Sequence, residues 1–511
     1  MKNYKYIGLF LLSLSIASCD VNNDLDEIPE VAVPEVALNT NGLDFSSYVS
    51  IGASFTAGFT DNALFKAAQE NSFPNILASK FNTTFNQPLM NDNIGGLLLG
   101  GNVIQGPRLF FNGSGPQPLN AMPTTEVTTS VAGALNNYGI PGAKSFHLVA
   151  QGYGNLQGVA LGLANPYFAR MSSGANATVL GDAMAQNPTF FTLSEVGGND
   201  VLGYALSGGT GVDQTGNLDP TTYGGSDITD PNVFANVLNT MVTTLTSGGA
   251  KGVVGNVPYI TNLAHFTTVP YNPVPMDASL AATVNGAYAP YNAGIVQAFG
   301  ALVQMQVMTQ AQADAEIAKR TINFSAGQNA VVIIDENLTD LEALNPAFAG
   351  LSQMRQATAD DLLVLPSSTF IGTLADPSNP LSINGVAVPL ADRWVLTPEE
   401  QTAIKNATDA YNTTIAGIVN ANSNVALVDL KGILEQASMG IAFDNYTMNT
   451  SLVTGGLISL DGVHLTARGY ALMANYILAA IDAEFGSNFT QATDGLAKAG
   501  DYPTNYSPML R

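Results

Sequence analysis

The chain has 511 residues, and 46% of them are hydrophobic, a composition typical of globular proteins. Only 11% are charged, and an excess of acidic residues gives a formal net charge of −23. A chain this acidic repels phosphate backbones, so we expect no nucleic acid partner. Its single cysteine, Cys19, excludes an internal disulfide framework.

Residues 1–18 have the pattern of a secretory signal peptide. Lys2 and Lys5 precede an apolar run over residues 6–14 that is too short to span a bilayer. The sequence IASC at 16–19 resembles the bacterial lipobox, in which the cysteine becomes the lipidated first residue of the mature chain. The resemblance implies a membrane anchor at Cys19, held by acyl chains at ~0.8 kcal/mol per buried CH₂ group. The alternative is an ordinary signal peptide with an unrelated cysteine.

Residues 19–44 form an acidic segment, in which residues 20–42 include six acidic residues, two prolines and no basic residue. This composition predicts an extended, solvated tether. An acidic stretch directly after a lipidated cysteine resembles the surface-export signal of lipoproteins in the Bacteroidetes group. We therefore expect the protein on the outer membrane, lipid-anchored and exposed at the cell surface.

Strand and helix patterns alternate from about residue 45 onward. Apolar runs predict strands, and apolar residues at a 3.6-residue period predict helices. The helix that follows Thr397 opens with an N-cap, a proline and Glu400 three residues after the cap. Alternating elements favour an α/β fold with a parallel sheet covered on both faces. The strands are expected at 47–52, 189–196, 252–257 and 425–430, and the helices at 230–250, 397–419 and 466–485.

Three long segments interrupt this alternation and predict insertions at 84–136, 203–230 and 258–395, the last partly helical. Loops of this length are either functional or disordered. In α/β folds they gather at the carboxyl edge of the strands, where ligands bind. Leu97–Leu99 could line an acyl pocket, although packing inside the insertion is the favoured interpretation. Residues 491–511 are expected to form a C-terminal tail.

Four short blocks hold residues suited to the hydrolysis of acyl esters. A serine hydroxyl needs a base to become a nucleophile, histidine supplies that base, and a carboxylate orients the imidazole. The oxyanion that develops needs hydrogen-bond donors already in place. The blocks are GASF with Ser54, NNYGIPGAKS with Gly142, LSEVGGNDVLGYA with Asn199, and LDGVHLTARGY with Asp461 and His464.

In this order the blocks resemble the SGNH branch of the GDSL esterase and lipase family. The resemblance implies a three-layer α/β/α, flavodoxin-like domain over residues 45–490 with a parallel sheet of about five strands. It implies Ser54 as nucleophile, His464 as base and Asp461 as the orienting acid. The oxyanion donors would be the backbone N–H groups of Ser54 and Gly142 and the Asn199 amide.

One position departs from the family pattern, because Ala53 stands where the family has an aspartate before the serine. This leaves open how the Ser54 loop is held. Asp200 is expected to fix a turn by hydrogen-bonding the backbone rather than to act as a second acid. His147 and His265 lack an acid at the right spacing, and we interpret both as structural.

The leading hypothesis is a membrane-anchored serine esterase or lipase that acts on acyl-lipid esters and needs no cofactor or metal. Two alternatives stay open. One is a polysaccharide O-acetyl esterase of the same fold, which the low aromatic content disfavours. The other is a non-catalytic surface lipoprotein that docks as a subunit of an outer-membrane protein complex.

Overall fold

A computed structural model describes residues 35–131 and 133–511. The predicted signal peptide, Cys19 and the tether up to residue 34 lie outside the described residues. The chain divides into two units, Met1–Ala37 and Leu38–Arg511, and the second holds the fold. The second unit begins inside the predicted tether, where the Asn39 N–H donates to the Asn488 side chain at 2.7 Å. Within the described residues, no helix is long and apolar enough to cross a bilayer.

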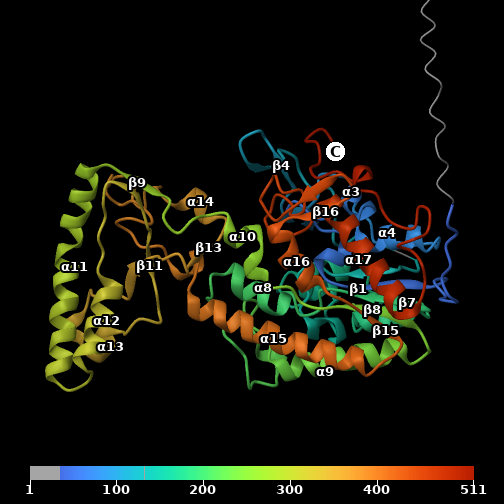
Figure 1. The fold of residues 1–511 in the computed structure, drawn as a ribbon, viewed down its shortest axis with the longest axis horizontal. Coiled ribbons are helices and arrows are strands. Elements are labelled where there is room, and N and C mark those ends of the chain that lie inside the picture. Colours follow the sequence, from blue (N-terminus) through green and yellow to red (C-terminus); the bar gives the residue numbers. More distant parts are fainter. Residues whose placement is uncertain (1–34, 132) are drawn as a thin grey trace, which may run out of the picture. The chain divides into compact units, whose positions relative to one another are not determined.

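A parallel sheet of five strands forms the centre of the second unit (Figure 1). Its spatial order is β15-β8-β7-β1-β6, which numbers the strands 5-4-3-1-2 along the chain. This is the flavodoxin-like order, and the direction of winding reverses between β1 and β7. The expected α/β class with a parallel sheet is confirmed. The strands are β1 (Tyr48–Gly52), β6 (Asn137–Gly139), β7 (Phe190–Leu193), β8 (Lys251–Gly255) and β15 (Val425–Val428).

The four strands expected from apolar runs are all present, because both faces of a parallel sheet are buried and select continuous apolar sequence. Strand β6 was missed. Its sequence, Asn-Tyr-Gly, has the composition of a turn, and it pairs with β1 in a register that sets Gly52 against Gly139. A side chain at Gly139 would come within 2.2 Å of the Ala57 nitrogen, so the close approach requires glycine.

Helices cover the sheet in two groups. Helix α4 (Phe73–Lys80) packs against α17 (Ala467–Phe485), and α9 (Pro231–Thr246) packs against α15 (Pro398–Asn420). Figure 1 shows the two pairs on opposite sides of the strands, which gives three layers. The helices expected at 230–250, 397–419 and 466–485 are confirmed, as is the capping box of α15.

The remaining elements of the sheet domain are short. Leu97 packs in a small hydrophobic cluster with Leu64 and Met90 and does not line the pocket beside Ser54, which favours the packing interpretation. The helices are α2 (Ser54–Ala57), α3 (Lys66–Glu70), α5 (Leu156–Val159), α6 (Pro166–Ala169), α7 (Val179–Met184), α8 (Asn199–Leu206) and α16 (Leu430–Met439). The hairpins are β2 (Leu97–Leu99) with β3 (Asn102–Gln105), β4 (Leu109–Phe111) with β5 (Pro116–Pro118), and β16 (Ile441–Phe443) with β17 (Tyr446–Met448).

The insertion at 258–395 is partly helical, as expected, and contains two hydrophobic clusters of its own. A buried ion pair joins Arg355 to Asp335 and Asp361 at 2.5 and 2.7 Å. Its helices are α10 (Ala264–Thr267), α11 (Ala278–Gln304), α12 (Gln310–Arg320), α13 (Leu341–Leu344) and α14 (Ser367–Phe370). Its strand pairs are β9 (Val274–Met276) with β10 (Gly327–Asn329), β11 (Val332–Ile334) with β12 (Met354–Gln356), and β13 (Leu362–Leu363) with β14 (Val395–Leu396).

Candidate active site

Three of the predicted site residues follow the carboxyl ends of three neighbouring strands. Ser54 begins α2 directly after β1, Gly142 follows β6, and Asn199 begins α8 after β7. Because these strands are adjacent and parallel, their ends meet at one edge of the sheet. Ser54 and Asn199 flank the β1/β7 switch point, where doubly wound folds bind their ligands.

Asp461 and His464 lie in the loop between β17 and α17. The Nδ1 atom of His464 is 2.9 Å from Oδ2 of Asp461. The other carboxylate oxygen accepts the backbone N–H groups of Val463 and His464, and Asn62 donates a further N–H to Oδ2. Burial acts to raise the pKa of Asp461, but the nearby imidazole and these hydrogen bonds outweigh it and hold the pKa well below its usual range. An ionised Asp461 fixes the proton on Nδ1, which leaves Nε2 as a base.

The same loop comes close to the helix that begins at Ser54. The His464 ring packs against Phe55 and Phe59, with ring centroids 5.8 and 4.6 Å apart. Ser54 itself is 7% exposed and borders a pocket together with Val463 and Leu465, the neighbours of His464. Among the described residues, no hydrogen bond joins Ser54 Oγ to His464. Catalytic hydrogen bonds often tighten only when substrate binds.

The candidate donors for an oxyanion follow the carboxyl ends of β1, β6 and β7. Within the described residues, the backbone N–H groups of Ser54 and Gly142 have no hydrogen-bond acceptor in the protein. The Asn199 side chain donates one N–H to the Ala143 carbonyl at 2.9 Å, which leaves its second N–H available. Gly142 has φ +80°, a conformation that favours glycine. The Asn199 amide therefore lies next to the turn that holds Gly142, and Asn199 and Ser54 border the same pocket.

Asp200 holds the turn that follows Gly142. Its carboxylate accepts the backbone N–H of Ser145 at 2.8 Å and the Ser145 hydroxyl at 2.6 Å. Asp200 hydrogen-bonds the backbone, as expected, but the turn that it holds is the one after Gly142 and not its own. Because it joins α8 to the turn after β6, it also fixes the separation of Asn199 from Gly142.

Glu195 holds the Ser54 turn, at which Ala53 stands in place of an aspartate. It follows β7, is buried, and its Oε1 atom accepts the backbone N–H groups of Ala53 at 2.7 Å and Thr56 at 2.8 Å. Its Oε2 atom lies 3.1 Å from the Thr56 hydroxyl. A carboxyl group from the neighbouring strand therefore holds the Ser54 turn. Glu195 has φ +46°, a strained conformation for a residue with a side chain, which points to a functional constraint. Sequence reasoning missed it, although it is the acidic residue closest to the strand end in its block.

Substitutions at Glu195 should separate its role as an acceptor from its charge. Glu195→Ala leaves two buried N–H groups unpaired, at about 1–3 kcal/mol each. We expect a lower melting temperature and a drop in kcat of about 10²-fold, because a small misplacement of a nucleophile has that effect. Glu195→Gln keeps the acceptor and should retain kcat within a few-fold. Equal losses in both variants would contradict a positioning role.

The pH dependence of stability gives a second readout for Glu195. Burial raises its pKa to about 7, despite the hydrogen bonds that act to lower it. The unfolded value is about 4.3. The folded state therefore retains a proton between these values, and the resulting stability is lost as the pH rises through this window. On lowering the pH from 7 to 5, the parent protein should gain stability relative to Glu195→Gln, measured by thermal unfolding of both.

Two further residues support the loop that carries Asp461 and His464. Asp61, which is 1% exposed, accepts the Leu460 N–H at 3.1 Å. His265 donates its backbone N–H to the Gly462 carbonyl at 2.9 Å, while both of its ring nitrogens are buried without a hydrogen-bond partner. His265 thus packs against the loop that carries Asp461 and His464. Asp61 was missed because the sequence around it reads as an ordinary turn.

His147 lies away from this loop. Its Nδ1 atom accepts the Lys144 N–H at 3.1 Å, and its ring stacks on Tyr153. Burial and the Lys144 charge lower the pKa of His147 to about 4, so the ring is neutral at pH 7. These contacts agree with the structural interpretation of this histidine.

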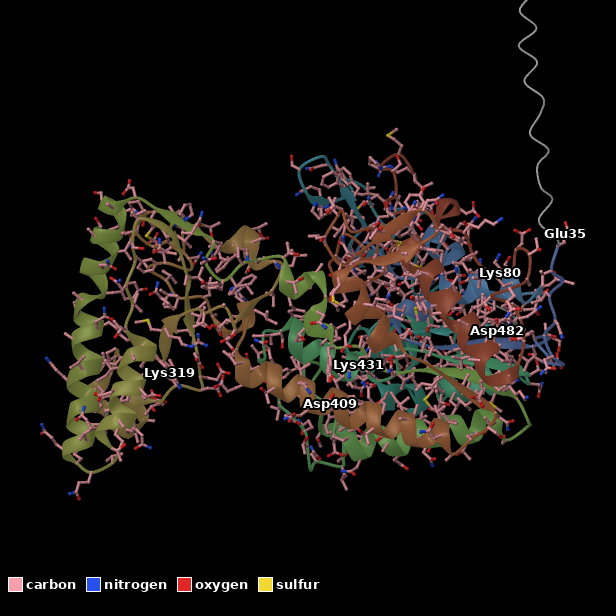
Figure 2. The ribbon with its side chains drawn as sticks, in the orientation of Figure 1. Glu35, Lys80, Lys319, Asp409, Lys431 and Asp482 are labelled. Atoms are coloured by element: carbon pink, nitrogen blue, oxygen red, sulfur yellow. The ribbon has the colours of Figure 1, made fainter. Side chains whose placement is uncertain are left out.

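An apolar pocket opens beside Ser54 and encloses ≈ 100 Å³. Residues 258–260 form one wall of the pocket. Tyr259 joins this segment to two helices. The Tyr259 hydroxyl donates to Asp409 of α15, and the ammonium group of Lys431 of α16 lies over the Tyr259 ring. Figure 2 labels Asp409 and Lys431 on these two helices. Most lining side chains are aliphatic, and they include Leu202, Leu263, Leu430, Ile433, Leu434, Leu472 and Met473.

No family model, curated protein or solved structure matches this chain. The fold class therefore follows from the strand order of its own sheet. The resemblance to the SGNH branch stays a prediction that rests on the four sequence blocks.

Proposed function

We propose that the protein is a serine esterase that hydrolyses acyl esters at the carboxyl ends of the central strands β1 and β7. The observation that carries the proposal is the meeting of three separate features at this edge of the sheet. Ser54 follows β1, Gly142 and Asn199 follow the neighbouring strands β6 and β7, and on the loop before α17 the Nδ1 atom of His464 lies 2.9 Å from Oδ2 of Asp461. A non-catalytic docking subunit would not require this combination.

The proposed reaction has two steps. The Ser54 hydroxyl attacks the ester carbonyl while Nε2 of His464 takes its proton, and the donors stabilise the oxyanion. The tetrahedral intermediate then expels the alcohol, which receives that proton from His464. A water molecule, activated by the same imidazole, attacks the acyl-enzyme and releases the carboxylic acid. These residues complete the hydrolysis with water as the only co-reactant.

The lining of the pocket favours an acyl chain as the group that enters it. An aliphatic wall stabilises buried CH₂ groups at about 0.8 kcal/mol each and offers few partners for the hydroxyl groups of a sugar. An acyl-lipid ester is therefore the preferred substrate class. A lipid anchor at Cys19 and an outer-membrane location would bring the site close to such lipids, and both remain part of the proposal.

Hydrolysis of p-nitrophenyl acetate, butyrate, octanoate and palmitate by the purified protein tests the function. We expect turnover with kcat/KM rising from acetate to the medium chains. Turnover of acetate alone would favour the O-acetyl esterase. The absence of turnover on any ester would favour the docking subunit.

A substitution that narrows the pocket should act on long chains only. Ile433 lies half-buried on α16 in the pocket wall, and Ile433→Trp fills space that an acyl chain would occupy. Excluding about four CH₂ groups corresponds to ~3 kcal/mol, or about 10²-fold in kcat/KM for the octanoate ester. Acetate turnover should change by only a few-fold.

The matched control is Met439→Trp, at the end of the same helix and 85% exposed. It should leave the rates for all chain lengths unchanged. Equal losses on acetate and octanoate in Ile433→Trp would show that the acyl chain binds elsewhere.

A further inference from the structure

Three carboxylates gather at a point away from the catalytic residues. Glu336 follows β11, Asp392 lies in the turn before β14, and Glu400 stands in the first turn of α15. One carboxylate oxygen from each lies within 4.8 Å of the other two. The insertion supplies the first two residues, and the sheet domain supplies the third.

Two oxygens of this cluster are buried without a partner. Glu400 is 4% exposed, and its Oε2 atom accepts the N–H and the hydroxyl of Thr397, which completes the capping box. Its Oε1 atom and Oδ1 of Asp392 have no hydrogen-bond donor within reach in the described chain. An unpaired buried acceptor is costly, and a charged one more so. A positively charged ligand at this point would pair with both atoms.

The backbone beside the cluster accommodates the carboxyl group of Glu400. Gly209 follows α8 with φ +83°, and a Cβ atom there would lie 1.8 Å from Oε1 of Glu400. No basic side chain fills the space, since none of the ion pairs formed by the described residues involves the three carboxylates. The nearest arginine in sequence, Arg393, lies over the Trp394 ring instead.

We propose that Glu336, Asp392 and Glu400 bind a divalent cation of the calcium class. Calcium takes six to eight oxygen ligands at 2.3–2.6 Å, so two oxygens on one ion lie up to about 5 Å apart. The spacing of the cluster fits this limit, and water would complete the coordination. The sequence analysis expected no metal, because the three ligands lie 64 positions apart in the chain from first to last and form no local motif.

Such an ion would fasten the insertion to the sheet domain. It would join the turn before β14 to the start of α15 and would lie against Gly209, three residues beyond the end of α8. Cation binding to the folded state alone stabilises it by mass action. This role is independent of the proposed esterase activity, and binding can be measured without a substrate.

Trp394, the single tryptophan of the chain, can report ion binding because it lies two residues from Asp392. Terbium is a luminescent substitute for calcium that an excited tryptophan nearby can sensitise. In the full chain at 0.15 M KCl, we expect terbium emission on excitation of Trp394, saturation at one ion per chain, and displacement by calcium. Calcium should also raise the melting temperature of the parent protein.

Glu400→Gln keeps the acceptor of the capping box but removes one ligand charge. It should weaken terbium and calcium binding by more than about 10-fold, while circular dichroism stays unchanged. Asp392→Asn should have the same effect and serves if the first variant does not fold. The control is Glu399→Gln, which makes the same charge change on an exposed neighbour in the same helical turn and should bind as the parent does.

Two results would overturn the proposal. One is equal binding in the parent and in both cluster variants, which would mark the signal as non-specific attraction to an acidic protein. The other is the absence of any calcium effect on the melting temperature of the parent, together with a more stable Glu400→Gln. That result would mean that the carboxyl groups share protons rather than hold an ion.

Discussion

Ser54→Ala is expected to reduce the hydrolysis of p-nitrophenyl esters to the background rate, a loss of about 10⁶-fold in kcat. The reason is that the serine hydroxyl forms the acyl-enzyme in the proposed mechanism, and alanine offers no oxygen for the attack. Alanine fits the first position of α2, so the fold and its melting temperature should change little. The measurement is kcat on the best ester of the chain-length series, together with mass spectrometry after treatment with an alkyl fluorophosphonate.

The parent protein should gain a single phosphonyl adduct at Ser54, and Ser54→Ala should gain none. Ser46→Ala is the matched control, because Ser46 lies exposed just before β1, at the opposite end of the strand from Ser54. It should keep full activity and full labelling. Activity that persists in Ser54→Ala would assign the nucleophile to another residue.

Asp461→Asn should cost about 10⁴-fold in kcat, the effect seen when a triad histidine is locked in the wrong tautomer. Oδ1 of Asp461 accepts two backbone N–H groups, so an asparagine would keep its oxygen there and place its NH₂ group against Nδ1 of His464. That arrangement moves the imidazole proton to Nε2, which can no longer accept the proton of Ser54. Binding of a long-chain ester should change far less than kcat.

The pH dependence of stability checks that the substitution acts on this carboxylate. Because the folded-state pKa of Asp461 is lowered, its contribution is fully present above the unfolded value of about 3.9 and is lost as the pH falls. The difference in melting temperature between parent and Asp461→Asn should therefore shrink in acid. Asp314→Asn, the same change at an exposed position on α12, is the control. A kcat within 10-fold of the parent in Asp461→Asn would remove Asp461 from the mechanism.

The sequence predicts the parts of the fold in which local pattern and burial agree. Strand β8 and helix α9 follow from their apolar runs, and the N-terminus of α15 follows from Thr397 and Glu400. Strand β6 was missed because Asn137 to Gly139 carry no β-forming pattern, and the neighbours β1 and α2 impose the extended conformation. The order of the strands in the sheet is a tertiary property that no single segment encodes.

The candidate site also contains both residues that the sequence predicts and residues that it does not. Ser54, Asn199 and His464 were found from the sequence because their chemistry requires particular residue types in short blocks. Glu195 and Asp61 were missed because they act on the backbone, and any residue with an acceptor at the right place could do so. The same limit applies to the carboxylate cluster at Glu400, whose members meet only through the packing of the insertion.

The contact between Glu195 and the Ser54 turn has a consequence for how the protein acquires activity. The two partners are 142 positions apart in the chain, so the turn cannot be held until β7 has docked beside β1. Closing a loop of that length is entropically unfavourable, and such contacts form late in folding. A nascent chain that ends before β7 therefore carries the serine without the scaffold that directs it. Under the proposed mechanism, Ser54 becomes a competent nucleophile only in a chain that has completed the centre of its sheet, and recovery of the proposed esterase activity during refolding should report that pairing.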